Sequence, residues 1–283
     1  MEINKVFTSN NLNINFKNLT EVAKKAALVG ADILNDNYKK IQKITSKGRK
    51  GDLVTNVDLE VEKNIKEFLI KECPEISILA EESGKPNNLK DLYWCIDPLD
   101  GTTNYSHGYP FFGTSVGLVF KDLPILGAIS VPYLNELYWA CIDNGAFCNG
   151  TKLKVSSPKN LSESLLVTGF AYDRFEIIDN NYAEFCWLTH KTRGVRRGGA
   201  AAVDLAFVAS GKVDGFWERG LEKWDLAAGA IIVHEAGGIV SNYPNGNFEL
   251  SSGRILCCSP SIEDEIKKEL SKVSPLNPQL YTG

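Results

Sequence analysis

The sequence predicts a layered α/β fold, and three observations support this prediction. The chain has 283 residues, of which 43% are hydrophobic and 23% are charged, so it is long enough to bury a large core. Segments with apolar residues at helical spacing alternate with short runs rich in β-branched and aromatic residues. Both kinds of segment occur in both halves of the chain, and this mixture indicates helices packed on sheets.

The first half begins with two predicted helices. Apolar residues recur at helical spacing over residues 19–34, with lysines between them. The segment "KITSKGRKG" (residues 43–51) has four basic residues and two glycines, and we predict a solvated surface loop there; a flap over an active site is the alternative. A second helix follows, because Thr55 and Asp58 have the spacing of a capping box and Pro74 lies just beyond the last periodic residue.

Strands are predicted next, and the second half mixes both element types. "EISILAEES" and "LYWCIDPLD" are β-rich runs that end in carboxylates, and "FFGTSVGLVF", "PILGAISVP" and "ELYWACI" form a meander that "NGAFCNG" closes. The later strands are "SESLLVTGF", "VDGFWER" and "RILCCSP", and the later helices are "NNYAEFCWLTHK", "AAAVDLAFVASG", "WDLAAGAIIVHEAGG" and "SIEDEIKKELSKV". We expect one catalytic unit (1–283) with an N-terminal half at 15–157 and a C-terminal half at 158–275.

Composition limits the partners and the cellular location. A formal charge of -4 and a pI near 5.6 imply no general attraction to nucleic acid or to anionic membranes. No run of 18 apolar residues occurs and the N-terminal segment lacks a signal-peptide pattern, so we expect a cytoplasmic protein. The seven cysteines are odd in number and form no CxxC pair, so we expect reduced thiols.

The strongest functional signal is a set of acidic residues at the ends of predicted elements: Asp58, Glu81, Asp97, Asp100 and Asp225. A single carboxylate at a helix start is usually only a cap. In "IDPLDG", however, Pro98 restrains the turn and Gly101 permits backbone torsions that a side chain opposes. Asp97 and Asp100 are therefore predicted to converge on one point.

Two converging carboxylates repel each other unless a proton or a cation neutralises them. Ligands that are all oxygen, with no histidine or cysteine in ligand spacing, indicate Mg²⁺ or Mn²⁺ rather than Zn²⁺. An EF-hand is discounted because its D-x-D-x-D-G spacing is missing. Gly101, Thr102 and Thr103 then offer backbone N–H groups and hydroxyls in a tight turn, which predicts a phosphate site.

The segments "DLVTNVDLEVE", "LAEES", "IDPLDGTTNY" and "WDLAAGAIIVHEAGG", in this order, resemble the inositol monophosphatase family. The resemblance extends from about residue 20 to residue 270. It implies a five-layer αβαβα sandwich, a homodimer, and hydrolysis of a small-molecule phosphate monoester with two or three Mg²⁺ ions, for which Mn²⁺ is a possible substitute. It also implies inhibition by Li⁺.

The resemblance assigns metal ligands. Glu81, Asp97 and the backbone carbonyl of Leu99 match the positions that hold the first ion. Asp97, Asp100 and Asp225 match the second, and a third, weaker ion in some members involves the position of Glu81.

The resemblance also assigns catalytic and substrate positions. Asp58 and Thr102 match the pair that orients and deprotonates the attacking water, and Glu81 is counted with them as catalytic. Gly101 and Thr102 match phosphate contacts. The residues expected to contact the substrate are Asp100, Gly101, Thr102, Gly199, Ala201, Glu218 and Asp225, of which Gly199, Ala201 and Glu218 match positions near the alcohol.

The substrate remains open among related compounds. Inositol 1-phosphate is the first choice, and histidinol phosphate, fructose 1,6-bisphosphate and 3′-phosphoadenosine 5′-phosphate are the alternatives, since fold and metals do not separate them. A catalytically inactive regulatory relative is a further reading, against which every matched acid is present. Arg196 and Arg197 have four open interpretations: a dimer surface, a salt bridge, an anionic substrate or plain exposed surface.

Overall fold

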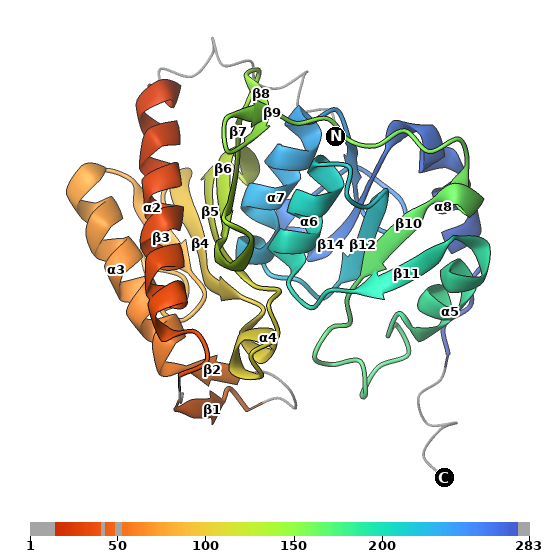
Figure 1. The fold of residues 1–283 in the computed structure, drawn as a ribbon, viewed down its shortest axis with the longest axis horizontal. Coiled ribbons are helices and arrows are strands. Elements are labelled where there is room, and N and C mark those ends of the chain that lie inside the picture. The colour runs from red at the N-terminus through yellow and green to blue at the C-terminus, as the bar shows by residue number, and fades with distance from the viewer. Residues whose placement is uncertain (1–14, 41–42, 49–52, 277–283) are drawn as a thin grey trace.

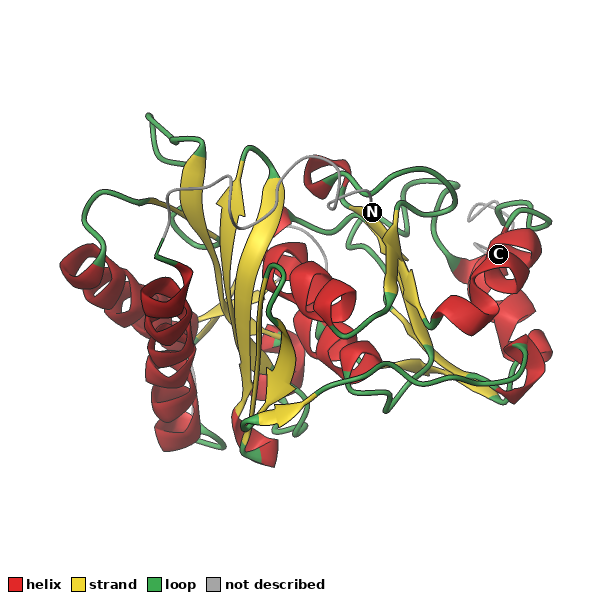
Figure 2. Ribbon diagram, turned by 90° about the horizontal axis from the view of Figure 1, so that it is seen from above, coloured by secondary structure: helices red, strands yellow, loops and turns green. Residues whose placement is uncertain are grey.

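The structure is a computed structural model that describes residues 15–40, 43–48 and 53–276. Its elements form five alternating layers in the order helix, sheet, helix, sheet, helix (Figures 1 and 2). This arrangement confirms the predicted αβαβα sandwich. Residues 1–14, which carried the expectation about a signal peptide, lie outside the described residues.

The first layer contains helices α2 (Phe16–Asn37) and α3 (Asn56–Glu72), both of which were predicted. Both hydrogen bonds of the expected capping box start α3, because the Thr55 side chain accepts from the backbone of Asp58 and the Asp58 side chain accepts from the backbone of Thr55. Asp58 therefore lies in the first turn of the helix with its side chain turned toward the chain that precedes it.

The second layer is a sheet of seven strands in the order β3-β4-β5-β6-β7-β8-β9. Strands β3 and β4 are parallel, and the other pairs are antiparallel. The central strands are buried almost throughout because helices cover both faces of the sheet. The strands are β3 (Ser77–Ala80), β4 (Leu92–Asp100), β5 (Gly113–Phe120), β6 (Leu123–Val131), β7 (Glu136–Cys141), β8 (Gly145–Cys148) and β9 (Thr151–Lys152).

Helices α6 (Ala201–Ala209) and α7 (Lys223–Glu235) form the middle layer, and α7 lies unusually close to the first sheet. A Cβ atom added at Gly127 would lie 2.6 Å from Cα of Ala228, and one at Gly117 would lie 2.7 Å from Cβ of Ala227. These two glycines of the sheet therefore allow direct backbone-to-backbone packing of α7.

The fourth layer is a sheet of five strands in the order β11-β10-β12-β14-β13, and helices α5 (Tyr182–Lys191) and α8 (Glu263–Leu270) cover its outer face (Figure 1). Strand β10 is parallel to β11 and β12, and β14 is antiparallel to β12 and β13. The strands are β10 (Leu165–Thr168), β11 (Gly194–Arg197), β12 (Gly215–Arg219), β13 (Ile239–Ser241) and β14 (Arg254–Cys258).

Several short elements differ from the predictions. The segment 43–51 was predicted to be a loop, but residues 44–46 form strand β1 (Ile44–Ser46), which pairs with β2 (Leu53–Thr55); residues 49–52 lie outside the described residues. The predicted tight turn after Gly101 continues into a short helix, α4 (Thr102–Ser106). Strands β9, β11 and β13 were not predicted because runs of two to four residues carry little periodicity. The 3₁₀ helices are η2 (Pro132–Leu134), η3 (Leu161–Glu163), η4 (Leu250–Ser252) and η5 (Pro260–Ile262).

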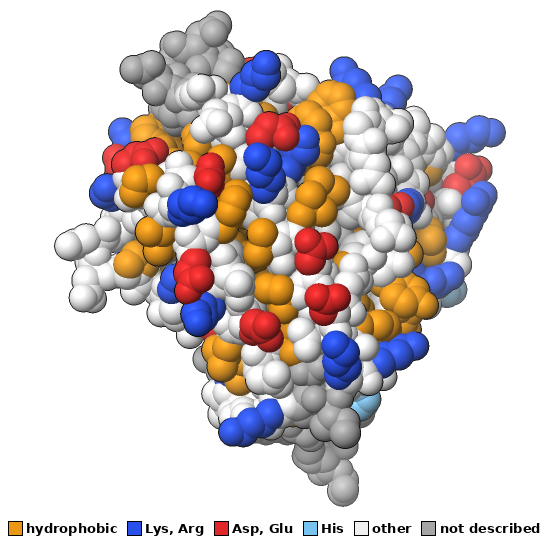
Figure 3. All heavy atoms as spheres, turned by 60° about the vertical axis from the view of Figure 1, so that its left-hand side comes forward, with side chains coloured by type: hydrophobic (Ala, Val, Ile, Leu, Met, Phe, Trp, Pro, Cys, Tyr) orange, Lys and Arg blue, Asp and Glu red, His pale blue; other side chains and the backbone are white. Residues whose placement is uncertain are grey.

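One face of the molecule is mixed in charge (Figure 3). On the side of the first helix layer, hydrophobic side chains lie between acidic and basic ones, without a field of one sign (Figure 3). Across the described residues, no helix is both long enough and apolar enough to cross a membrane. All seven cysteines are free thiols, as expected.

The packing of α7 gives a prediction about stability. Gly127→Ala is expected to lower the free energy of unfolding by about 1 to 3 kcal/mol, because its methyl group must displace the backbone of α7. Urea denaturation followed by circular dichroism measures the change. An unchanged midpoint would contradict the close approach of helix and sheet.

Candidate active site

The two acidic residues at the end of β4 are placed by an irregularity in the sheet. The register between β4 and β5 shifts between Asp97 and Asp100, around Pro98. Such a bulge changes the direction of neighbouring side chains. Both carboxylates are buried, and Asp97 Oδ1 accepts a hydrogen bond of 3.0 Å from the N–H of Leu99. Strand β4 therefore ends with two carboxylates held inside the molecule.

Asp100 also caps a helix of the second half. Helix α6 begins after Ala200, whose side chain has no acceptor for the free N–H groups of the first turn. Asp100 Oδ2 accepts the N–H of Val203 at 3.1 Å, and the N–H groups of Ala201 and Ala202 also stabilise the charged carboxylate. The contact joins the first sheet to the middle layer, and the positive end of the helix dipole favours the negative charge.

Asp225 lies at the start of the other middle-layer helix. It is the third residue of α7, and its Oδ2 accepts the N–H of Glu222 at 2.7 Å. The Glu222 side chain in turn accepts the N–H of Asp225, which completes a capping box. Helix α7 therefore presents its N-terminus, and with it Asp225, to the site.

Glu81 follows β3 and contacts a lysine from the hairpin of β1 and β2. Lys47 Nζ lies 2.7 Å from Oε1 of Glu81 and 2.6 Å from Oε1 of Glu82. The turn that carries both acids is fixed by Glu62 on α3, whose carboxylate accepts the N–H groups of Glu82 and Ser83. The prediction of a solvated loop at residues 43–51 is therefore wrong at Lys47, which reaches the active site.

Asp58 and Thr102 form a hydrogen-bonded pair. The Thr102 hydroxyl donates to Asp58 Oδ1 at 2.9 Å and lies 3.1 Å from the carbonyl oxygen of Leu99. Asp58 Oδ2 accepts the N–H of Thr55 at 2.9 Å and its hydroxyl at 2.5 Å. Burial raises the pKa of Asp58, and the hydrogen bonds from Thr55 and Thr102 lower it.

A cavity of about 370 Å³ brings the predicted residues together. Asp58 is the exception, because it lies behind Thr102 and reaches the cavity through it. The predicted residues that line the cavity are Glu81, Asp97, Leu99, Asp100, Gly101, Thr102, Gly199, Ala201, Glu218 and Asp225. This common location agrees with their assignment to one site, and their individual roles stay predictions.

Two glycines shape the cavity. A Cβ atom at Gly169 would lie 2.1 Å from Oε2 of Glu218, so only glycine leaves room for this carboxyl group. Gly199 has a φ of 84°, and a Cβ atom there would lie 2.2 Å from Nη1 of Arg197. Gly199 is therefore favoured for its left-handed backbone conformation, and a side chain there would also force the guanidinium of Arg197 to move.

Ionisation of the buried acidic residues in this cluster is unfavourable. Burial raises the pKa of Asp100 to about 7, and it raises the pKa of Asp97 and Asp225 well above the ordinary value. After burial, the charge of Glu81 contributes most to the raised pKa values of Asp97 and Asp225. Burial raises the pKa of Glu81 too, although Lys47 opposes the shift. Like charges gathered in a dry site need cations or protons to balance them.

The donor set of the cluster fits a hard divalent cation. Asp97, Asp100 and Asp225 each use one oxygen to accept a backbone N–H group, which orients the carboxylate without using its second oxygen in that bond. In the described part of the chain, no three Asp, Glu, His or Cys side chains already surround one point, and Glu81 is engaged with Lys47. Carboxylate oxygens of this kind are the ligands that Mg²⁺ and Mn²⁺ prefer.

Sequence reasoning missed or left open three basic residues of the cavity. Lys47, Arg174 and Arg197 line it, whereas Arg196 is not among the lining residues. Arg196 and Arg197 are consecutive in β11, so their side chains point to opposite faces of the strand. A prediction of β11 as a strand would have placed the side chains of Arg196 and Arg197 on opposite faces.

Comparison with known proteins places the chain in a family. The model of the Inositol monophosphatase family matches residues 15–274. An inositol-1-monophosphatase from Synechocystis sp. is 48% identical over 252 residues, which are 89% of this chain and 88% of the relative. A solved inositol monophosphatase from Anabaena (Nostoc) sp. has a TM-score of 0.84 and 45% identity, and the match covers 93% of this chain and 99% of the other. A fructose-1,6-bisphosphatase/inositol-1-monophosphatase from Aquifex aeolicus is 41% identical over 227 residues, which are 80% of this chain and 86% of the relative.

The fold and the site therefore define a phosphoric monoester hydrolase. The chain belongs to the inositol monophosphatase family, and the resemblance read from its motifs is confirmed.

The repulsion within the cluster gives a prediction about the metal-free protein. Asp97→Asn is expected to raise the free energy of unfolding in excess EDTA by about 1 kcal/mol, since it removes a carboxyl group whose ionisation is opposed by burial and by Glu81, and its amide oxygen can still accept the N–H of Leu99. Differential scanning calorimetry with and without EDTA measures the change.

Asp91→Asn is the matched control, because Asp91 is exposed and precedes the same strand. Destabilisation by Asp97→Asn in EDTA would show that the carboxylate contributes hydrogen bonds that outweigh its repulsion.

Proposed function

We propose that this chain hydrolyses a phosphate monoester, with inositol 1-phosphate as its substrate, in a reaction that requires Mg²⁺. The observation that carries the proposal is the convergence of buried carboxylates, the Thr102–Asp58 pair and the Gly101 turn on one cavity. The Synechocystis relative bears the name inositol-1-monophosphatase, and its identity of 48% supports the choice of alcohol.

Two or three Mg²⁺ ions, or Mn²⁺ as a substitute, would be held by the acidic cluster. The ligands are Glu81, Asp97, the carbonyl oxygen of Leu99, Asp100 and Asp225. When bound, the ions neutralise charge on the phosphate and lower the pKa of the attacking water.

The chain's own residues position the reactants and move the proton. Thr102 orients the water with its hydroxyl oxygen, and the hydroxyl proton is directed at Asp58 Oδ1. As the water attacks phosphorus, its proton passes to the Thr102 oxygen while the Thr102 proton passes to Asp58. The bond between phosphorus and the alcohol oxygen breaks, and the alkoxide takes its proton from solvent.

Other residues bind the two ends of the substrate. Gly101 and the first N–H groups of α4 face the phosphate. Gly199, Ala201 and Glu218 contact the alcohol. Burial raises the pKa of Glu218 to about 8, so at neutral pH its carboxyl group is largely protonated and can both donate to and accept from a ring hydroxyl.

Alternatives to inositol 1-phosphate keep the same chemistry. Histidinol phosphate, fructose 1,6-bisphosphate and 3′-phosphoadenosine 5′-phosphate are phosphate esters that this metal site would also accept. The Aquifex relative, whose name combines two of these activities, supports testing the bisphosphate. An inactive regulatory relative is disfavoured because every acid matched by the resemblance is present in the sequence.

Further properties are proposed from the family resemblance. They are a homodimer, inhibition by Li⁺, a cytoplasmic location, and no partner that is nucleic acid or membrane. We also infer that the halves 15–157 and 158–275 act as one catalytic unit, because Asp100 from β4 caps α6.

Two substitutions separate metal binding from water activation. Asp100→Asn is expected to weaken Mg²⁺ binding, because a charged ligand is lost, whereas Thr102→Ala leaves Mg²⁺ binding intact and lowers kcat by about 10² or more. Isothermal titration with Mg²⁺ and steady-state kinetics measure the two effects.

Excess EDTA should abolish turnover by the native protein, and added Mg²⁺ should restore it. Full activity of thoroughly metal-stripped protein, or identical defects in both variants, would contradict the assigned roles.

Glu218 gives a prediction about the alcohol end. Glu218→Ala is expected to lower kcat/KM for inositol 1-phosphate about tenfold or more at pH 7, because a buried hydrogen-bonding partner is lost. Glu218→Gln should retain most of the activity at this pH, since an amide resembles the protonated carboxyl group.

p-Nitrophenyl phosphate serves as the control substrate, because it has no ring hydroxyl that Glu218 could bind. Equal losses on both substrates would show that Glu218 supports the metal site or the fold instead.

A further inference from the structure

The segment that follows β10 lies directly against the end of β12. A Cβ atom at Gly169 would lie 2.1 Å from Oε2 of Glu218, and one at Gly220 would lie 2.5 Å from Cβ of Ala171. We call residues 169–174 the wall segment, because five of them line the cavity: Gly169, Phe170, Ala171, Tyr172 and Arg174. The wall segment therefore bounds the cavity beside Glu218, where the alcohol is proposed to bind.

An ion pair holds the wall segment from the other face of β12. Successive side chains of a strand point to opposite faces, so Arg219 lies on the face away from Glu218. There Nη2 and Nη1 of Arg219 donate to the two carboxylate oxygens of Asp173, at 2.6 and 3.3 Å. A contact through two nitrogens fixes orientation as well as distance, because the planar guanidinium matches the plane of the carboxylate. Arg219 therefore determines where Asp173, and with it the wall segment, lies.

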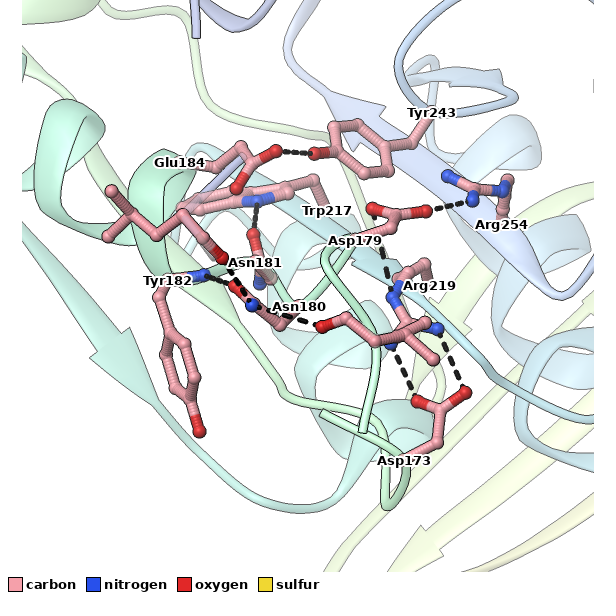
Figure 4. Close-up of polar contacts among 12 residues, drawn as sticks. Asp173, Asp179, Asn180, Asn181, Tyr182, Glu184, Trp217, Arg219, Tyr243 and Arg254 are labelled. Atoms are coloured by element: carbon pink, nitrogen blue, oxygen red, sulfur yellow. Dashed lines mark hydrogen bonds and ion pairs between the residues drawn. The ribbon is translucent and has the colours of Figure 1, made fainter. Parts of the chain in front are cut away.

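This ion pair belongs to a chain of charged contacts (Figure 4). Asp179 lies 3.8 Å from Nε of Arg219 and forms an ion pair with Arg254 of β14. Arg219 is buried, whereas the side chains of Asp173 and Asp179 are 38% and 36% exposed. A buried guanidinium without partners is costly, whereas an exposed carboxylate can be hydrated instead. Arg219 therefore needs its acidic partners more than they need it.

The two ends of the segment between β10 and α5 are fixed by other contacts. Asn181 precedes α5 and donates to the carbonyl oxygen of Gly169 at 2.7 Å. It also accepts a hydrogen bond of 2.6 Å from Nε1 of Trp217 (Figure 4). These bonds join both ends of the segment to each other and to β12 without Arg219. Loss of the ion pair with Asp173 is therefore expected to loosen the cavity wall and to leave the fold intact.

We propose that Arg219 is a positioning residue that sets the selectivity of the site for the alcohol, because its ion pair with Asp173 holds the wall segment in place. The inference rests on the proposed phosphatase activity and deepens it. A wall that is ordered before the substrate arrives loses little conformational freedom on binding, which strengthens binding. The Thr102–Asp58 pair and the acidic cluster lie on other elements, so turnover of bound substrate depends little on this ion pair.

The first test separates binding of the alcohol from turnover. Arg219→Met is expected to raise KM for inositol 1-phosphate about tenfold and to change kcat by less than about twofold. The KM for p-nitrophenyl phosphate, which has no polyol to be recognised, should stay within about twofold of the native value. The variant should fold, since the two released acids are in contact with solvent. Equal effects on both substrates, or a loss confined to kcat, would contradict the proposed role.

A second variant separates the position of the wall from the charge of Arg219. Asp173→Ala breaks the same ion pair but leaves the positive charge next to Glu218 in β12, with Asp179 as its partner. It should raise KM for inositol 1-phosphate as much as Arg219→Met does, and the double variant should show no further rise, because both changes remove one interaction. Additive effects, or an effect of Arg219→Met alone, would overturn the inference.

Arg254→Met is the matched control. It removes another arginine of the same chain of contacts, whose partner Asp179 lies outside the wall segment. Its KM for inositol 1-phosphate should stay within about twofold of the native value. A rise equal to that of Arg219→Met would mean that loosening of the whole region changes KM, and it would overturn the specific role of the contact with Asp173.

Hydrogen exchange gives a readout that does not depend on turnover. The N–H of Glu176 donates to the carbonyl oxygen of Asp173 at 2.8 Å in the native protein. Peptides that span this bond should exchange faster in Arg219→Met and Asp173→Ala, and at the native rate in Arg254→Met. If no ester is hydrolysed but exchange changes in this way, the proposed activity fails and the bracing by Arg219 stands. Unchanged exchange, or faster exchange with an unchanged KM, would overturn the inference even if the native protein hydrolyses inositol 1-phosphate efficiently.

Discussion

The hydrogen bonds from the start of α6 to Asp100 join the two halves of the molecule where the acidic residues meet. Asp100 ends a strand of the first sheet, and the helix that it caps, α6, belongs to the second half. The same interaction offsets part of the cost of burying a carboxylate, because free N–H groups and the helix dipole favour its charge. Asp225 is held in a similar way at the start of α7, so both helices of the middle layer direct their positive ends toward the site. The acidic cluster depends on this arrangement.

The cavity is divided into two ends of opposite character. Buried acids repel each other at one end, whereas Arg174 and Arg197 line the cavity together with Glu218. Thr102 and Asp58 lie beside the acidic end, and Glu218 lies toward the basic end. A side chain at Gly169 or at Gly199 would collide with the present positions of Glu218 and Arg197.

Local signals predicted the parts of the site that depend on neighbouring residues. The capping box placed Asp58 correctly because its bonds involve residues three apart, and strand ends placed Asp97 and Glu81 because apolar runs stop there. The convergence of Asp225 with these residues involves elements more than 100 positions apart, so only the motif resemblance joined them. The five-layer order came from the same resemblance, whereas the mixture of helices and strands came from periodicity.

Short strands and contacts between distant residues could not be predicted from the sequence. Strand β1 has three exposed residues and no alternation, so the contact of Lys47 with Glu81 was hidden within an apparently solvated basic segment. Strand β11 is also short, and without it Arg196 and Arg197 were indistinguishable. The ion pair between Asp173 and Arg219 joins positions 46 residues apart, and no local pattern predicts it.

The central claim is that the buried carboxylates form a site for divalent cations. Anomalous X-ray diffraction from crystals grown with Mn²⁺ tests it directly, because Mn²⁺ prefers the same oxygen ligands as Mg²⁺ and scatters anomalously. We predict ions in contact with Asp97, Asp100 and Asp225, with Glu81 turned from Lys47 toward an ion. Ions bound only elsewhere, or an acidic cluster without an ion at saturating Mn²⁺, would contradict the account.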